Sequence, residues 1–163
     1  MIVALDVQYT EDTGKVAGVY FDTWTSERSS RDSWRWVTPI EPYVSGQFYK
    51  RELPCLLALL KHSDLYVDCV VIDGYVDTTS GCPGLGRHLY DALGQTTPVV
   101  GVAKTNFHGT SAVPVLRGRA SLKPLFVTAA GMDVNEAAHC VQLMHGAHRI
   151  PTLLKRADFL ARS

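Results

Sequence analysis

Residues 66–74, YVDCVVIDG, form the longest apolar run that ends in an acidic residue and a glycine. Its apolar residues do not alternate with polar ones, and such a run predicts a strand that is buried on both faces of a sheet. The run ends at Asp73 and Gly74. Open α/β sheets bind ligands at the carboxyl ends of their strands, so Asp73 is a candidate for a ligand site. The ordinary alternative is that Asp73 and Gly74 form a turn.

The residues before this stretch predict a sheet followed by a helix. Three strands are expected, at Met1–Tyr9, Lys15–Trp24 and Ser33–Ile40. A helix is then indicated by leucines that recur at i, i+3, i+4 and i+7, namely Leu53, Leu56, Leu57 and Leu60. Pro54 should lie in the first turn of this helix or kink it.

The residues after it alternate between helical and strand patterns. Helices are expected at Gly84–Leu93, Asn135–His145 and Thr152–Ala161, and strands at Pro98–Ala103, Val113–Arg119 and Leu122–Thr128. A hairpin that leads into alternating strands and helices predicts an α/β fold with a mixed sheet and flanking helices.

The composition is that of one folded domain, residues 1–163. Basic and acidic residues balance at 16 each, which is unusual for a nucleic-acid-binding protein, although a local basic patch is compatible with it. The four cysteines show no zinc-like spacing. No signal peptide and no membrane-spanning run are found, so a cytoplasmic protein without membrane association is expected.

Three carboxylates occupy positions that suit a metal site. Asp6 lies in the first strand, Glu52 begins the first helix, and Asp73 ends the buried strand. A carboxylate among apolar residues is costly to bury unless it is paired or bound to a metal. Oxygen ligands from separate elements are what Mg²⁺ requires. An ordinary turn or surface charge is the alternative for each residue, and their spacing alone does not show that they meet.

Ordered motifs over nearly the whole chain resemble the endonuclease V family. The most specific is PYVSGQFYKRELP at residues 42–54, and VVIDG at 70–74 follows it. The remaining matches, in the family's order, are DVQY at 6–9, PVVGVAK at 98–104, LRGRASLKPLFVT at 116–128, RIP at 149–151 and AD at 157–158.

The resemblance implies a ribonuclease H-like fold and a function. It implies Mg²⁺-dependent cleavage, with Mn²⁺ as a possible substitute, of DNA or RNA that contains inosine. The cut would fall at the second phosphodiester bond 3′ of the lesion. The resemblance assigns metal binding to Asp6, Glu52 and Asp73 and a catalytic role to Lys104. It places Tyr43, Ser45, Gly46, Gly101 and His88 on the substrate. A monomer is expected.

The chain departs from the family pattern at two histidines. Thr79 stands where the family usually has a histidine six residues after the aspartate of its DG motif, and Met132 replaces a second one. Asp133 follows directly and is a candidate alternative metal ligand. His88 falls on the family's helix histidine, although packing against the sheet is the simpler role for it.

Three functions are compatible with these patterns. The first is an inosine-directed endonuclease. The second is a related nucleic-acid-binding protein with weakened or lost catalysis, which would account for the missing histidines and the absence of net charge. The third is a nuclease or resolvase of different specificity on the same fold.

Overall fold

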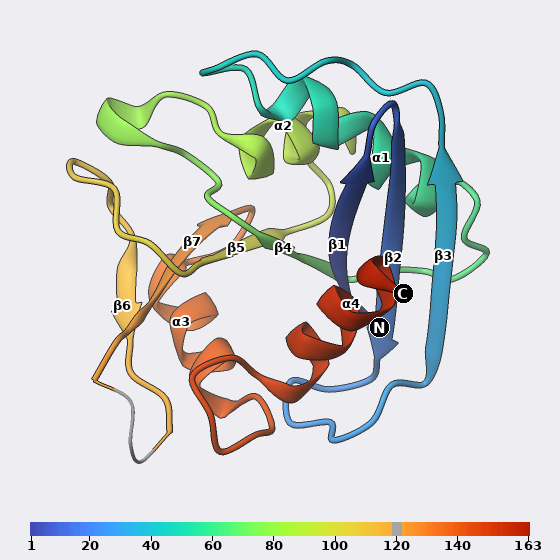
Figure 1. The fold of residues 1–163 in the computed structure, drawn as a ribbon. Coiled ribbons are helices and arrows are strands. Elements are labelled where there is room, and N and C mark those ends of the chain that lie inside the picture. Colours follow the sequence, from blue (N-terminus) through green and yellow to red (C-terminus); the bar gives the residue numbers. More distant parts are fainter. Residues whose placement is uncertain (119–121) are drawn as a thin grey trace.

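The computed structural model of the protein describes residues 1–118 and 122–163. They form one mixed sheet of seven strands in the order β3-β2-β1-β4-β5-β7-β6 (Figure 1). The strands are β1 (Ile2–Thr10), β2 (Thr13–Phe21), β3 (Arg31–Val37), β4 (Cys69–Asp73), β5 (Val99–Ala103), β6 (Val113–Val115) and β7 (Leu125–Ala130). The central strands β1, β4 and β5 run parallel, and the outer pairings are antiparallel.

Helices cover both faces of the sheet. On one face lie α1 (Tyr49–Lys61) and α2 (Leu85–Ala92), and on the other lie α3 (Val134–Leu143) and α4 (Thr152–Arg162). A short 3₁₀ turn, η1 (Thr79–Gly81), connects β4 to α2. The mixed sheet with flanking helices that the sequence predicts is therefore confirmed.

The alternation of side chains along the strands creates two separate cores. Val70 and Ile72 face α1 and α2, whereas Cys69 and Val71 face α3 and α4. Each face thus has its own helices to bury against, which is why β4 has no polar residue before Asp73. In the described part of the chain, no helix is long and apolar enough to cross a membrane.

Several element boundaries differ from the sequence-based expectation. β3 ends at Val37 and not at Ile40, because Pro39 has no N–H to donate to a neighbouring strand. β2 ends at Phe21, where the chain turns and Trp24 packs its ring edge-on against Phe21 with the centroids 6.4 Å apart. β4 begins only at Cys69, so the expectation of a strand from Tyr66 was too long.

Other differences concern Pro54 and the carboxyl-terminal strands. Pro54 was expected in the first turn of this helix or at a kink, and it is the sixth residue of α1, just beyond the first turn. β6 ends at Val115, and Arg119, the expected last residue of that strand, lies outside the described residues. β7 begins at Leu125, directly after Pro124, and extends to Ala130.

Gly101 lies where the loop after β4 crosses β5. A Cβ atom on Gly101 would be 2.5 Å from the carbonyl oxygen of Gly74 and 2.6 Å from Oγ1 of Thr128. The first is a backbone atom that cannot move away by changing a rotamer. Gly74, the residue that follows Asp73, therefore packs so closely on position 101 that only glycine fits there.

We expect Gly101→Ala to lower the free energy of unfolding by about 2–3 kcal/mol, the usual cost of overpacking a tight interior. Chemical denaturation measures it. Gly14→Ala is the matched control, because its Cβ would meet only side-chain atoms, the nearest being Sγ of Cys55 at 3.0 Å. An equal or smaller cost at Gly101 would contradict this view of the crossing.

Candidate metal and nucleic-acid site

Parallel pairing of β1 with β4 brings two of the predicted site residues side by side. The strands pair in register from Ile2 with Cys69 to Leu5 with Ile72, so Asp6 and Asp73 are the next residues along each strand. Residues in register on parallel strands point to the same face of the sheet. Asp6 is buried and Asp73 is half exposed, and both face the side that carries α4.

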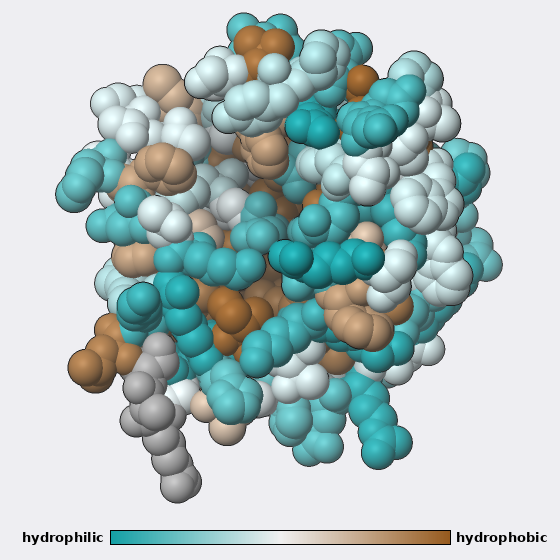
Figure 2. Space-filling model, viewed as in Figure 1, coloured by the Kyte–Doolittle hydropathy of each residue, from teal (hydrophilic) through white to brown (hydrophobic). Residues whose placement is uncertain are grey.

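A cleft of about 220 Å³ opens on this face, between the sheet and α4. Its floor is apolar, from Leu5, Val71, Leu125 and Ile150, and its polar rim includes Asp6, Asp73, Lys104, Lys155 and Asp158. Figure 2 shows the same face, where brown apolar surface lies deep in a central hollow that teal polar side chains surround.

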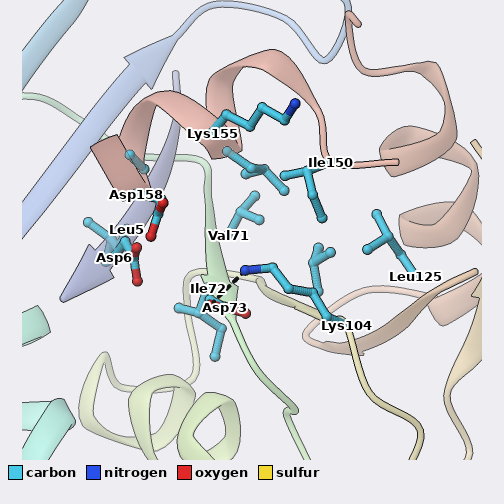
Figure 3. Close-up of a pocket in the computed structure, with 13 residues that line it drawn as sticks. Leu5, Asp6, Val71, Ile72, Asp73, Lys104, Leu125, Ile150, Lys155 and Asp158 are labelled. Atoms are coloured by element: carbon cyan, nitrogen blue, oxygen red, sulfur yellow. Dashed lines mark ion pairs between the residues drawn. The ribbon is translucent and has the colours of Figure 1, made fainter. Parts of the chain in front are cut away.

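Lys104 and Asp158 complete the polar rim of the cleft (Figure 3). Lys104 follows β5, and its Nζ lies 3.6 Å from Oδ2 of Asp73. Asp158 projects from α4 toward Asp6, and the two carboxyl groups share a hydrogen bond. A hydrogen bond between two carboxyl groups requires that one of them carry a proton.

Glu52 approaches this edge from the other side of the sheet, on α1. Its side chain is only 6% exposed, and its Oε2 has no hydrogen-bond partner in the part of the chain that the structure describes. A buried carboxylate oxygen without a partner carries the full cost of its lost hydration. Helix packing holds Glu52 there, because the neighbouring residues Cys55 and Leu56 are fully buried in the core.

The carboxyl groups perturb one another. Burial, followed by the charge of Asp73, raises the pKa of Asp6 to about 7. Burial, followed by the charges of Asp6 and Asp73, raises the pKa of Glu52 to about 8, against a smaller opposing effect of Arg51. Asp6, Glu52 and Asp73 are therefore close enough to repel one another. Structures that concentrate negative charge in this way usually serve a functional site.

These residues fit a hard divalent cation, but they do not form a closed set of ligands. Within residues 1–118 and 122–163, no three carboxylate, imidazole or thiol side chains converge closely enough to hold an ion. Asp73 is paired with Lys104, and Asp6 is paired with Asp158. The buried, partnerless Oε2 of Glu52 and the mutual repulsion are the features that a cation would relieve.

The PYVSG segment forms an exposed turn before α1. The N–H of Gln47 donates to the carbonyl of Val44 at 2.9 Å, and Gly46 between them has φ +77°. A turn of this kind needs a glycine at that position. Tyr43 and Ser45 are exposed on the turn, and the Tyr43 ring meets the Phe48 ring edge-on with centroids 6.2 Å apart.

Two other predicted substrate residues have structural contacts. Gly101 is buried in β5 beneath the loop after β4. His88 on α2 stacks face to face on Tyr49 of α1, with ring centroids 3.7 Å apart. Neither lines the cleft that holds Asp6 and Asp73.

The residues at the two departures from the family pattern also have defined contacts. Oγ1 of Thr79 donates to the carbonyl of His108 at 2.9 Å, and Met132 packs against the core on the α3 face. Asp133 caps the amino terminus of α3, where its carboxylate accepts from the N–H of Glu136 at 3.1 Å. Asp133 therefore has a structural role as a helix cap, and this role does not involve the cleft.

No sequence pattern predicted a role for Asp158. Its motif, Ala157-Asp158, was noted only as part of the family resemblance. The available signal was the i, i+4 spacing from Leu153 to Ala157 to Ala161, which are the buried residues of α4. That spacing places Asp158 beside the buried face, where a carboxylate needs a partner.

The fold and the cleft define the class of this protein. Its mixed sheet, with Asp6 inside β1 beside Asp73 at the end of the parallel strand β4, is the ribonuclease H-like α/β fold. The endonuclease V family model matches residues 1–115, and the chain belongs to this family.

Individual relatives agree with this assignment. The chain is 34% identical to endonuclease V of Streptomyces coelicolor over 144 residues, which are 75% of this chain and 60% of the relative. It therefore spans about three fifths of that relative's length. The crystal structure of endonuclease V from Streptomyces avermitilis covers 99% of this chain and 79% of its own, with a TM-score of 0.83 and 26% identity.

A third structure shares the fold at lower identity. Endonuclease V of Ciona intestinalis, in complex with a 24mer DNA that contains an inosine followed by a ribo-adenosine, has a TM-score of 0.78 and 20% identity. The alignment covers 99% of this chain and 83% of that chain.

Because folding raises the pKa of Glu52, stability should depend on pH in the metal-free protein. The folded state holds this proton more tightly than the unfolded state, whose glutamate titrates near 4.5. Stability should therefore be greatest below about pH 4.5 for this group and fall as the pH rises through about 8. Glu52→Gln should flatten this fall and be the more stable protein at pH 9 by about 2 kcal/mol or more.

Urea denaturation at pH 6 and pH 9 in the presence of a chelator measures this effect. Glu41→Gln, at an exposed position in the loop before α1, is the control and should leave the pH dependence unchanged. A Glu52→Gln protein that loses stability with pH as steeply as the parent would refute the view that Glu52 is buried and repelled.

Proposed function

We propose that this protein is a divalent-metal-dependent endonuclease that cleaves DNA or RNA near deaminated purine, chiefly inosine. The observation that carries the proposal is the crowding of Asp6, Glu52 and Asp73 at one edge of the sheet, where burial and mutual repulsion raise two of their pKa values. Membership in the endonuclease V family and the inosine-containing DNA bound by the Ciona intestinalis relative support the choice of substrate.

Asp6, Glu52 and Asp73 would hold Mg²⁺ or Mn²⁺, and Asp158 is added to this set by its contact with Asp6. A bound cation supplies Lewis acidity toward the phosphate and favours deprotonation of a water molecule. A bound cation would relieve the cost of keeping Glu52 ionised and buried without a partner. Metal binding would therefore explain why the protein keeps these carboxyl groups close together although they repel one another in its metal-free form.

Lys104 would serve the phosphate. Its ammonium lies between the carboxylate of Asp73 and open solvent at the rim of the cleft, and half of its side chain is exposed. A lysine is a mobile point charge, so it can turn from Asp73 to a phosphate oxygen. Arg149 holds the backbone of this segment, because it donates to the carbonyls of Lys104 and Pro124.

The turn that carries Tyr43, Ser45 and Gly46 would probe the strand around the lesion. Tyr43 is exposed, precedes the helix that carries Glu52, and has the flat surface that an unstacked base requires. The family resemblance supports a cut at the second phosphodiester bond 3′ of the lesion. It also supports roles for Gly101 and His88, which would act by shaping the loop and helix behind the cleft.

A catalytically weak binding protein is the second candidate. It is favoured by Thr79 and Met132, which stand in place of two histidines and have packing contacts of their own. Salt-dependent binding without cleavage would identify it, since each phosphate contact releases counterions.

Cleavage should depend on the carboxylates and on Lys104. With Mg²⁺ or Mn²⁺, we expect the protein to cut inosine-containing single strands or duplexes of DNA or RNA. Asp73→Asn or Asp158→Asn should lower kcat about a thousandfold or more, and Lys104→Ala roughly a hundredfold.

Gel analysis of end-labelled substrates gives both the rate and the position of the cut. Asp133→Asn is the matched control, because asparagine also caps a helix. It should cleave at the parent rate. A parent protein that cuts no substrate with either ion, in the same way as Asp73→Asn, would exclude the endonuclease and favour the binding protein.

Tyr43→Ala should weaken recognition of the lesion and leave folding intact. We expect KM for an inosine substrate to rise about tenfold, because one stacking contact is worth about 1–3 kcal/mol. Steady-state kinetics on matched strands with and without inosine test it. Tyr66→Ala, an exposed tyrosine in the loop before β4, is the control. An unchanged preference for inosine in Tyr43→Ala would remove the PYVSG turn from recognition.

A further inference from the structure

Three large aromatic side chains are exposed on the face that carries α4. Phe159 on α4 is 65% exposed, and Trp34 and Trp36 on the edge strand β3 are 55% and 58% exposed. Trp34 and Trp36 are two residues apart, so both point to the same face of the sheet. Clustered exposed apolar side chains of this size mark interaction surfaces more often than isolated ones do.

Two contacts hold α4 beside this edge of the sheet. Arg156 pairs with Asp32 of β3, and Nζ of Lys15 donates to the carbonyl of Ser163 at 2.6 Å. Phe159 lies between Arg156 and Ser163 along the chain, and Trp34 lies between Asp32 and Trp36 on β3. The same Lys15 ammonium lies 5.6 Å and 5.5 Å from the ring centroids of Trp34 and Trp36. Arg156 and Ser163 lie three residues before and four residues after Phe159, so this side of α4 faces the β3 edge. Phe159, Trp34 and Trp36 are called here the aromatic strip.

A groove of about 560 Å³ lies beside the aromatic strip, and Phe159 is the strip residue that lines it. It lies between residues 27–29 and α4, and its lining includes Arg28, Lys155 and Phe159. Lys155 also lines the cleft with Asp6 and Asp73, so this residue borders both the groove and the cleft.

The groove carries positively charged side chains. Among the described residues, Arg28 and Lys155 have no ion-pair partner, whereas Arg156 is paired with Asp32, and Glu27 lies 3.9 Å from Nε2 of His145. Cations next to exposed aromatic rings suit a chain of phosphates with attached bases. A neutral protein can thus still present a local surface of this kind.

The strip is also close to the carboxylates across the sheet. Trp34 pairs with Ala17, and Ala17 pairs with Asp6. With neighbouring strands about 4.8 Å apart, the backbones of Trp34 and Asp6 are separated by roughly 10 Å. α4 packs over β1 and β2 between these two residues. A strand that is bound in the cleft would therefore cross the first turn of α4, at Lys155, to reach the groove and then the strip.

We propose that the aromatic strip and its groove bind the single strand that flanks the cut, with unpaired bases stacked on Phe159, Trp34 and Trp36 and phosphates against Arg28 and Lys155. The inference rests on the proposed nuclease function for its ligand. Bases in a duplex have their faces covered by neighbouring pairs, so the strip selects single-stranded over blunt duplex nucleic acid. With this strip, the enzyme would prefer lesions in unpaired or single-stranded regions.

Tryptophan fluorescence tests the proposal without any cleavage. The chain has three tryptophans, so a Trp24→Phe background makes emission report on Trp34 and Trp36 alone. In chelator, single-stranded oligothymidylate should quench this emission, and a blunt duplex of the same length should quench it far less. Phe159→Ala should weaken binding roughly 5- to 100-fold, the usual range for one stacked base.

The charged residues are tested by salt dependence. Arg28→Ala should reduce the slope of log affinity against log salt by about one, whereas Phe159→Ala should leave the slope unchanged. Arg35→Ala and Tyr66→Ala are the controls, because Arg35 is exposed on the opposite face of β3 and Tyr66 lies in the loop before β4. Both should bind like the parent protein. Trp36→Ala, checked for folding by circular dichroism, provides a second variant within the strip.

Three results would overturn the proposal. They are equal quenching by duplex and single strand, parent-like affinity in Phe159→Ala and Trp36→Ala, and self-association of the protein that the same substitutions abolish. The test is separate from that of the proposed function. A parent that binds through the strip and cuts nothing contradicts the nuclease alone, and a parent that cuts while its strip variants bind unchanged contradicts the strip alone.

Discussion

The parallel register between β1 and β4 is the constraint on which the site depends. It is set in the core by Ile2 against Cys69 and by Leu5 against Ile72, all of them buried. A shift of one residue would turn Asp6 into the α1 core and leave a different residue opposite Asp73. The apolar packing of both faces therefore fixes the spacing of two carboxylates, and α1 and α4 add Glu52 and Asp158 around them.

This arrangement opposes stability in the metal-free protein. Two buried carboxyl groups with raised pKa values, and one buried oxygen without a partner, each make folding less favourable. The hydrogen bond between Asp6 and Asp158, for which one of the two carboxyl groups carries a proton, offsets part of that cost. Burial of Glu52 lowers the stability of the metal-free protein, so folding alone does not explain it. Such destabilising charged groups are expected at a ligand-binding site.

Most helices and strands could be predicted from the sequence, because each is indicated by a pattern within its own segment. The apolar run before Asp73 and the leucine spacing of α1 each reflect burial that one element needs by itself. The boundaries were less accessible: β4 is shorter than its apolar run, because Tyr66 and Val67 lie outside the ladder. The pairing of Asp6 with Asp73 could not be derived from spacing, since it depends on strands that are distant along the chain.

Asp158 and the aromatic strip show what the sequence left hidden. Asp158 acquires meaning only when α4 docks on β1, and Trp34 and Trp36 looked like ordinary strand residues until their exposure beside α4 was seen. Asp133 shows the opposite case, because its position beside Met132 suggested a ligand and the structure gives it a helix cap. Side chains whose roles arise from tertiary contact are the ones that pattern reasoning misses.

The most direct measurement is anomalous diffraction from crystals of the protein grown with Mn²⁺. We expect an anomalous peak beside Asp6 of β1 and the carboxyl end of β4, with oxygens of Asp6, Glu52 and Asp73 around one ion and Lys104 turned away from Asp73. A fully ordered structure at high Mn²⁺ concentration that shows no peak there, or with Glu52 still facing away from the ion, would contradict it.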